Sequence, residues 1–130
     1  MNEVHALLRQ AGTYFLATCE DGQPHVRPFG TADLYQGRLY FLTGKSKAVS
    51  RQLHTNPRLE LCAMTEGGWL RVEGSAVEDD SREARVFVLE AHPKLQTVYS
   101  PDDGNMQMLY FKRASATFSS FTAAPETVEF

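Results

Sequence analysis

The segment Leu39-Tyr40-Phe41-Leu42-Thr43-Gly44-Lys45-Ser46-Lys47-Ala48-Val49 carries the strongest structural signal in the sequence. Its apolar first half predicts a strand, Gly44 predicts a turn, and the residues from Ser46 onward predict a helix. The first turn of a helix attracts anions, because its N–H groups are free and the helix dipole is positive there. Lys45 and Lys47 would add two ammonium groups, and Ser46 a hydroxyl. We therefore predict a phosphate-binding turn in this segment.

This segment is not a P-loop. Leucine stands at position 39, five residues before Gly44, where the Gly-x-x-x-x-Gly-Lys-Ser/Thr pattern requires glycine. The same residues would also suit an ordinary capped helix on the protein surface. Arg51, one helical turn beyond Lys47, is interpreted as a surface charge.

The composition indicates one domain over residues 1–130. Of the 130 residues, 42% are hydrophobic, enough for a core without disulfides or metals. The net charge of −3 argues against a nucleic-acid-binding protein, which carries a basic surplus. No apolar run reaches the roughly 18 residues of a membrane span, and the N-terminus has no secretory signal pattern. We expect a cytoplasmic protein that contacts neither membrane nor nucleic acid.

Cysteine and histidine usage argues against a metal centre. Cys19 and Cys62 fall within apolar segments that read as strands, and we interpret them as reduced thiols in the core. The four histidines are scattered, with no His-Glu-x-x-His or Cys-x-x-Cys spacing. No metal site is expected.

Hydrophobic periodicity and turn residues predict a mainly β protein with flanking helices. Helices are expected over 2–10, from 46 to about 56, and from 80 or 81 to 89; strands over 14–19, 24–33, 38–43, 59–64, 69–77 and 106–121. Asp21-Gly22 and Gln36-Gly37 mark tight turns between strands. Several strands at short intervals, joined mostly by tight turns, indicate a small antiparallel barrel.

Three motifs in this order resemble the pyridoxamine 5'-phosphate oxidase-like family, the FMN-binding split-barrel flavoproteins. Residues 13–19 and 21–28 are similar to the opening hairpin of the family. Residues 42–47, with a helix that ends at Asn56-Pro57-Arg58, are similar to its phosphate-binding turn, and 69–74 to the strand that follows. The resemblance implies a six-stranded antiparallel split β-barrel. It also implies a homodimer with FMN bound at the subunit interface.

The resemblance assigns Lys45, Ser46 and Lys47 to the FMN phosphate. The Thr43 hydroxyl would lie near the phosphate or the ribityl chain, or would simply favour the end of a strand. In the family, the strand that holds Arg27 lies along the flavin ring and offers backbone groups to its polar edge.

Four further residues are candidates for cofactor contacts. Arg27 lies in an apolar strand and would either anchor an anion or project from an exposed barrel face. Pro28 has no N–H, so it can offer only a carbonyl and a fixed shape. Phe29 is a weaker candidate, since such a residue more often belongs to the core. Trp69, on the polar face of its strand, suits either a dimer contact or a wall beside the cofactor.

The expected function is that of an FMN-dependent oxidoreductase acting on an unidentified small molecule, with NAD(P)H as a candidate electron donor. No catalytic residue is assigned, because the flavin supplies the redox chemistry. The sequence ends without the Arg- and His-containing segment by which true pyridoxamine phosphate oxidases grip their substrate, so that substrate is not expected. A non-enzymatic flavin carrier or electron-transfer module remains open. A barrel that binds F420 or haem also remains open, with His25 as the candidate haem ligand.

Overall fold

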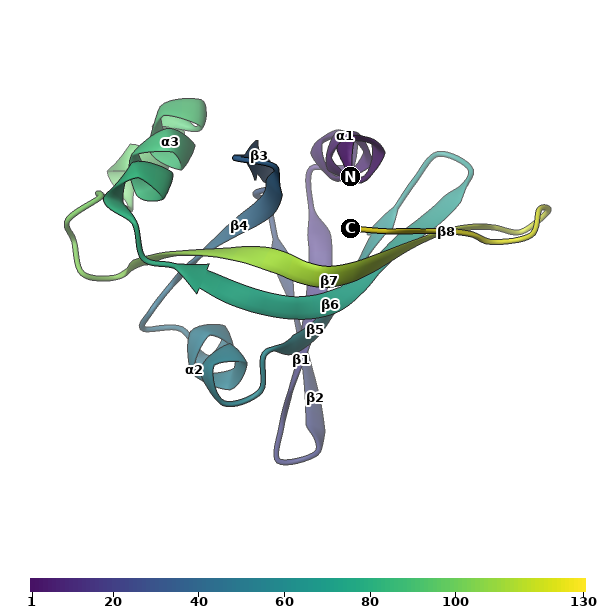
Figure 1. The fold of residues 1–130 in the computed structure, drawn as a ribbon, viewed down its shortest axis with the longest axis horizontal. Coiled ribbons are helices and arrows are strands. Elements are labelled where there is room, and N and C mark those ends of the chain that lie inside the picture. The colour runs from purple at the N-terminus through teal and green to yellow at the C-terminus, as the bar shows by residue number, and fades with distance from the viewer.

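The structure, a computed structural model, describes residues 1–130. Its elements in chain order are α1 (Asn2–Ala11), β1 (Tyr14–Glu20), β2 (Gln23–Phe29), β3 (Asp33–Tyr35), β4 (Arg38–Gly44), α2 (Ala48–Thr55), β5 (Arg58–Met64), β6 (Gly68–Asp79), α3 (Arg82–Ala91), the 3-10 helix η1 (Pro93–Thr97), β7 (Met106–Ser120) and β8 (Glu126–Glu129). Figure 1 shows the long, paired strands β6 and β7 crossing the molecule, with α2 and α3 near one end of the pair and α1 near the other.

All eight strands belong to one antiparallel sheet in the order β2-β1-β5-β6-β7-β4-β3, with β8 added beside β7. The predicted mainly β split barrel is therefore confirmed, with eight strands rather than six. The prediction that residues 24–33 form a hairpin with 14–19 is confirmed for β2, but this strand ends earlier than predicted, and the separate strand β3 was not predicted. The chain leaves β2 after Phe29 and enters β3 at Asp33, and these two strands lie at opposite ends of the sheet order.

Strand β4 is apolar on both faces because it separates two cores. Leu39 and Phe41 belong to the larger core, which α1 and α2 cover. Tyr40 and Leu42 belong to a smaller core beneath α3. Alternate strand residues point to opposite faces, so two cores require the continuous apolar run seen in the sequence.

Two further elements were not predicted from the sequence. Strand β8 pairs with residues 115–118 of β7, and all four of its residues are exposed. It carries no buried alternation that would mark it as a strand. The 3-10 helix η1 buries none of its residues either, which explains why periodicity missed it.

The prediction that both cysteines lie in the core was wrong. Cys19 and Cys62 are unpaired and half-buried. In β1, Leu16 and Thr18 point into the core, so Ala17 and Cys19 point to the outer face of the sheet. The apolar run was read correctly as a strand, but its residues divide between two faces.

A buried carboxylate joins three elements at one edge of the sheet. Asp33, at the start of β3, is 3% exposed. His92, which caps α3, lies 2.8 Å from Asp33 Oδ1 and 3.0 Å from Oδ2 through its Nε2 atom. Arg9 of α1 adds a longer ion pair of 3.9 Å. This cluster attaches both helices to β3.

Tyr40 stabilises the smaller core through a bond that depends on pH. Its hydroxyl donates to Asp79 Oδ2 at 2.7 Å. Burial and this bond raise the pKa of Tyr40 to about 12. Burial opposes ionisation of Asp79, but bonds from Tyr40 and Ser81 outweigh it and lower the Asp79 pKa from 3.8. Ionised Asp79 therefore stabilises the fold at pH values above 3.8, the ordinary pKa of an aspartate. This stabilisation is lost as the pH falls through the lower pKa that Asp79 has in the folded protein.

We therefore expect Tyr40→Phe to lower the free energy of unfolding by about 1 kcal/mol near neutral pH, the cost of one bond to a partly exposed carboxylate. Urea unfolding of both proteins at about pH 7 and about pH 3 measures the difference. The difference should shrink at the acid pH, because Asp79 is then largely protonated in the unfolded chain and the bond no longer favours the folded state as strongly. An equal difference at both pH values would contradict this account.

No helix of the protein is long and apolar enough to cross a membrane.

Candidate functional site

The turn after β4 is held by hydrogen bonds to Asn105, a residue far away in the sequence. Asn105, just before β7, accepts the Lys45 N–H through its backbone carbonyl at 2.7 Å and the Ser46 N–H through its side-chain oxygen at 3.0 Å. The Lys47 N–H donates to the Gly44 carbonyl at 3.0 Å. Gly44 permits this packing, since a Cβ there would lie 2.9 Å from the Asn105 side-chain nitrogen. Sequence reasoning missed Asn105 because nothing local marks it.

Helix α2 begins at Ala48, two residues later than predicted, with Lys47 as its N-cap. Ser46 and Lys47 are exposed, and Lys47 takes part in no ion pair within the chain. The N–H groups of residues 45–47 are already bonded, so an anion at this turn would meet the Ser46 hydroxyl and the Lys47 ammonium. The start of α2 adds the positive end of the helix dipole.

Lys45 points to the end of β6. Its Nζ atom lies 3.9 Å from Glu78 Oε2 and 3.8 Å from Asp80 Oδ1, and its side chain is 43% exposed. Long, exposed ion pairs contribute little to stability, so they would not hold Lys45 firmly. Of the three residues predicted to contact the phosphate (Lys45, Ser46 and Lys47), Lys45 is nevertheless the one whose charge already faces carboxylates of the chain.

Thr43 is buried directly before the turn. It is 2% exposed, and its Oγ1 atom has no hydrogen-bond partner. Gln107, its neighbour across the β4–β7 ladder, is 8% exposed and has an unpartnered Oε1 atom. These are the only buried side-chain polar atoms in the chain without a partner. Such atoms are uncommon in folded proteins.

Arg27 joins β2 to α2. Its Nη2 atom donates to Gln52 Oε1 at 2.6 Å, and Nη1 donates to Thr18 Oγ1 at 2.8 Å and to the carbonyls of Leu16 and His25 at 3.3 Å. The side chain is half-buried, burial lowers the pKa of Arg27, and no carboxylate pairs with it. An uncompensated guanidinium beside α2 fits an anion.

Arg51 does not add to these uncompensated cations. It forms an exposed, two-point ion pair with Glu20, at 3.1 Å for each bond. The interpretation of Arg51 as a surface charge is confirmed.

Pro28 and Phe29 point to opposite faces of the edge strand β2. Pro28 is exposed on the outer face, opposite Phe15 of β1. Phe29 packs against Tyr14 and Phe41, with ring centroids 6.0 Å and 5.6 Å away. Phe29 is therefore a core residue, whereas Pro28 is available to a ligand or a partner.

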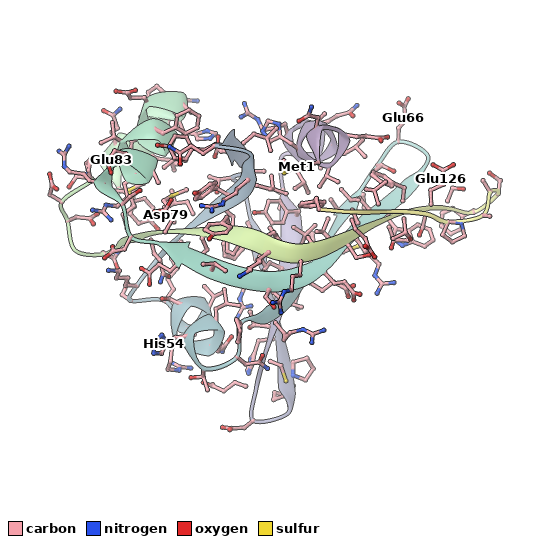
Figure 2. The ribbon with its side chains drawn as sticks, in the orientation of Figure 1. Met1, His54, Glu66, Asp79, Glu83 and Glu126 are labelled. Carbon is pink, nitrogen blue, oxygen red and sulfur yellow. The ribbon has the colours of Figure 1, made fainter.

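Within one chain, Trp69 lies far from the phosphate turn. It is the second residue of β6, and its ring centroid lies 5.2 Å from that of Phe121. Glu78, which faces Lys45, stands nine residues further along the same strand, about 30 Å away at the usual strand rise. Figure 2 shows Glu66, in the bend before β6, at the opposite end of the molecule from His54 on α2.

The outer face of strands β2, β1, β5 and β6 carries exposed apolar side chains. Phe15, Val26 and Met64 are 51%, 69% and 67% exposed. Pro28 lies opposite Phe15, and Trp69 lies opposite Met64. We call these five residues the exposed sheet face. Large exposed apolar patches are typical of surfaces that contact another molecule.

The fold defines a split barrel in which the turn before α2 presents the exposed side chains of Ser46 and Lys47. The sequence model of the family described as "Pyridoxamine 5'-phosphate oxidase" matches residues 1–130. The chain therefore belongs to the pyridoxamine 5'-phosphate oxidase family. No curated protein matches the sequence significantly.

Solved structures share this fold. A NimC/NimA family protein from Clostridium acetobutylicum is 38% identical with a TM-score of 0.96, and the match covers 100% of this chain and 92% of that one. A pyridoxamine 5'-phosphate oxidase-related, FMN-binding protein from Nostoc punctiforme is 17% identical, with a TM-score of 0.68 and coverages of 99% and 94%. A heme-binding protein from Mycobacterium smegmatis is 16% identical, with a TM-score of 0.73 and coverages of 98% and 56%.

Proposed function

We propose that this protein is an FMN-binding flavoprotein that acts as an oxidoreductase on a small molecule. The observation that carries the proposal is the pair of uncompensated cations beside α2, Arg27 and Lys47, in a member of this family. A phosphate group would supply the negative charge that both lack. Bound FMN supplies hydride and electron chemistry, so the protein's own residues need to bind and orient it.

Different residues would contact different parts of FMN. Lys47 and Ser46 would hold the phosphate, and Arg27 would anchor it from β2 while staying bonded to Gln52. Strand β2 pairs only with β1, so its other edge has free backbone groups. These groups would face the polar edge of the flavin ring, with Pro28 contributing shape and no N–H.

A homodimer with FMN at its interface would reconcile a cofactor contact by Trp69 with the distance of that residue from the turn. A Trp69 about 30 Å from the turn of its own chain can reach the flavin only from a second subunit. The exposed sheet face contains Trp69 and Pro28 and would supply the apolar contact between two subunits. Both halves of the cofactor site would then lie at the interface.

Haem is the second candidate, since a structural neighbour binds it. His25 lies half-buried on the same β2 strand as Arg27, and its ring forms no hydrogen bond within the chain. The unpaired cations would suit the FMN phosphate and the carboxylates of the haem propionates alike, so the absorption spectrum separates the two cofactors. If FMN is bound, anaerobic addition of NADH or NADPH separates an enzyme, whose flavin is reduced rapidly, from a carrier.

We expect the purified protein to show a flavin absorption spectrum and to release FMN on heating. Mass spectrometry of the released ligand identifies the cofactor. A Soret band would support haem instead. A colourless protein that takes up no added FMN would contradict the proposed function. The assignment of residues to the cofactor would then be wrong as well.

A further inference from the structure

The guanidinium of Arg27 is held by neutral groups alone. Its bonds within the chain run to the side chains of Gln52 and Thr18 and to the carbonyls of Leu16 and His25. No carboxylate forms an ion pair with it. A charge that is partly removed from water is usually paired with an opposite charge. The partners of Arg27 therefore fix the position of its guanidinium without cancelling the charge.

Gln52 is the central member of this arrangement. It is 3% exposed, and its Oε1 atom accepts the Thr18 hydroxyl at 2.5 Å and Arg27 Nη2 at 2.6 Å. The Thr18 hydroxyl oxygen in turn accepts Arg27 Nη1 at 2.8 Å. A guanidinium has donors only, so the oxygen of the Gln52 amide must be the atom that faces Arg27. Gln52 and Thr18 together thus receive both terminal nitrogens of Arg27.

One edge of the guanidinium remains open. Nη1 and Nη2 both face the bonded pair of Thr18 and Gln52. No bond within the chain uses the Arg27 Nε–H, and Nη2 has two N–H groups but forms a single bond. The Nε–H and the second Nη2–H lie on one side of the planar group, where a phosphate can bind at two points. The edge that Gln52 holds is therefore not the edge that an anion would use.

The carboxylate of Glu20 lies near this arrangement but belongs to another arginine. Hydrogen bonds, mainly from Arg51 and also from Gln52, lower the pKa of Glu20. Arg51 binds both Glu20 oxygens at 3.1 Å, through its Nε and Nη2 atoms. Arg51 thereby compensates Glu20, and Arg27 keeps its positive charge.

We propose that Gln52 is a positioning residue of the proposed flavin site, a neutral acceptor that orients Arg27 and leaves its charge to the cofactor phosphate. A glutamate has the same length and could receive the same two donors, but it would form an ion pair with Arg27. Gln52 follows Lys47 by five residues, about 7.5 Å along the axis of α2, so Arg27 is attached to the helix that begins at the turn. The inference rests on the proposed function, because it takes the FMN phosphate as the anion that Arg27 contacts.

Gln52→Glu tests this role, with FMN and riboflavin as matched probes, because riboflavin is FMN without its phosphate. Quenching of flavin fluorescence measures both affinities on the full chain. FMN binding should weaken about tenfold or more, the value of one charge-assisted hydrogen bond, while riboflavin binding stays within about twofold. The new carboxylate would gain Arg27 as a partner and would face a Glu20 that Arg51 already compensates. The melting temperature should therefore stay close to that of the unmodified protein.

Gln52→Met is a second variant, which decides the question if riboflavin binds too weakly to measure or if Gln52→Glu does not fold. It removes the acceptor, so Arg27 is no longer oriented and FMN binding should weaken several-fold. In an Arg27→Met background the same change should have no further effect, because Gln52 acts only through Arg27. An equal loss in both backgrounds would show that Gln52 merely supports the fold, and it would overturn the proposal.

The titrations separate failure of this inference from failure of the proposed function. An unmodified protein that binds no FMN would overturn both. If the unmodified protein binds FMN, two results would overturn the role of Gln52 alone. One is unchanged FMN affinity in Gln52→Glu, and the other is an equal loss of FMN and riboflavin affinity in that variant.

Discussion

Replacing Ser46 and Lys47 together by alanine is expected to weaken FMN binding by at least about tenfold to a hundredfold. The loss of one charge-assisted hydrogen bond costs about 1.5–3 kcal/mol, and the double variant removes both side chains that the turn offers to the phosphate. Quenching of flavin fluorescence during titration measures the affinity. Lys94→Ala is the matched control, because Lys94 is an exposed lysine on η1 outside the turn. Unchanged affinity in the double variant would remove the phosphate assignment.

The same variant tests whether the site is shared between subunits. Trp69→Ala should also weaken FMN binding, and a mixture of the two variants should regain it in part. Each mixed dimer would hold one intact site, made from the unmodified turn of one subunit and the unmodified Trp69 of the other. With free exchange about half of the dimers are mixed, so about a quarter of all sites should bind FMN tightly. No recovery on mixing would contradict a site built from two subunits.

Gly68→Ala is expected to lower the free energy of unfolding by about 3 kcal/mol or more, because it forces the backbones of β6 and β7 apart. A Cβ at Gly68 would lie 1.9 Å from the Ser119 carbonyl oxygen and 2.8 Å from Ser120 Cα. Both atoms belong to the backbone, so no side-chain movement relieves the clash. Urea unfolding followed by circular dichroism measures the effect.

Gly67→Ala is the matched control for this prediction. A Cβ at Gly67 meets nothing within 4 Å, and its backbone is not in the left-handed region. Its effect should stay within about 0.5 kcal/mol of zero. If the two alanine variants unfold with the same free energy, the close pairing of Gly68 with β7 is wrong.

Features that depend on neighbouring residues were predicted well from the sequence. The turns at Asp21-Gly22 and Gln36-Gly37 both adopt positive φ, as two-residue hairpin turns require. Helix α3 is capped by Ser81, one of the two predicted caps, and α2 ends at Thr55, shortly before Pro57. These features follow from backbone preferences that act over a few residues.

The candidate site was only partly predictable. The sequence pointed to the turn around Ser46 and Lys47, because the local run of cations there is unusual. It also pointed to Arg27, because an isolated arginine in an apolar strand can be recognised without a structure. It did not point to Asn105 or Gln107. An asparagine in a loop and a glutamine in a strand look ordinary until β7 is placed beside β4.

By itself the sequence determined most of the elements, the mainly β class and the chemistry available at the turn after β4. Periodicity, turn residues and helix caps act locally, and they need no knowledge of distant partners. Only the tertiary structure decided which of these groups meet. The order of strands in the sheet brings Ser46 to Asn105 across 59 positions and Arg27 to Gln52 across 25. It also turns Lys45 toward Glu78 and places Trp69 far from the turn, because contacts between strands depend on register and sheet order rather than on local preference.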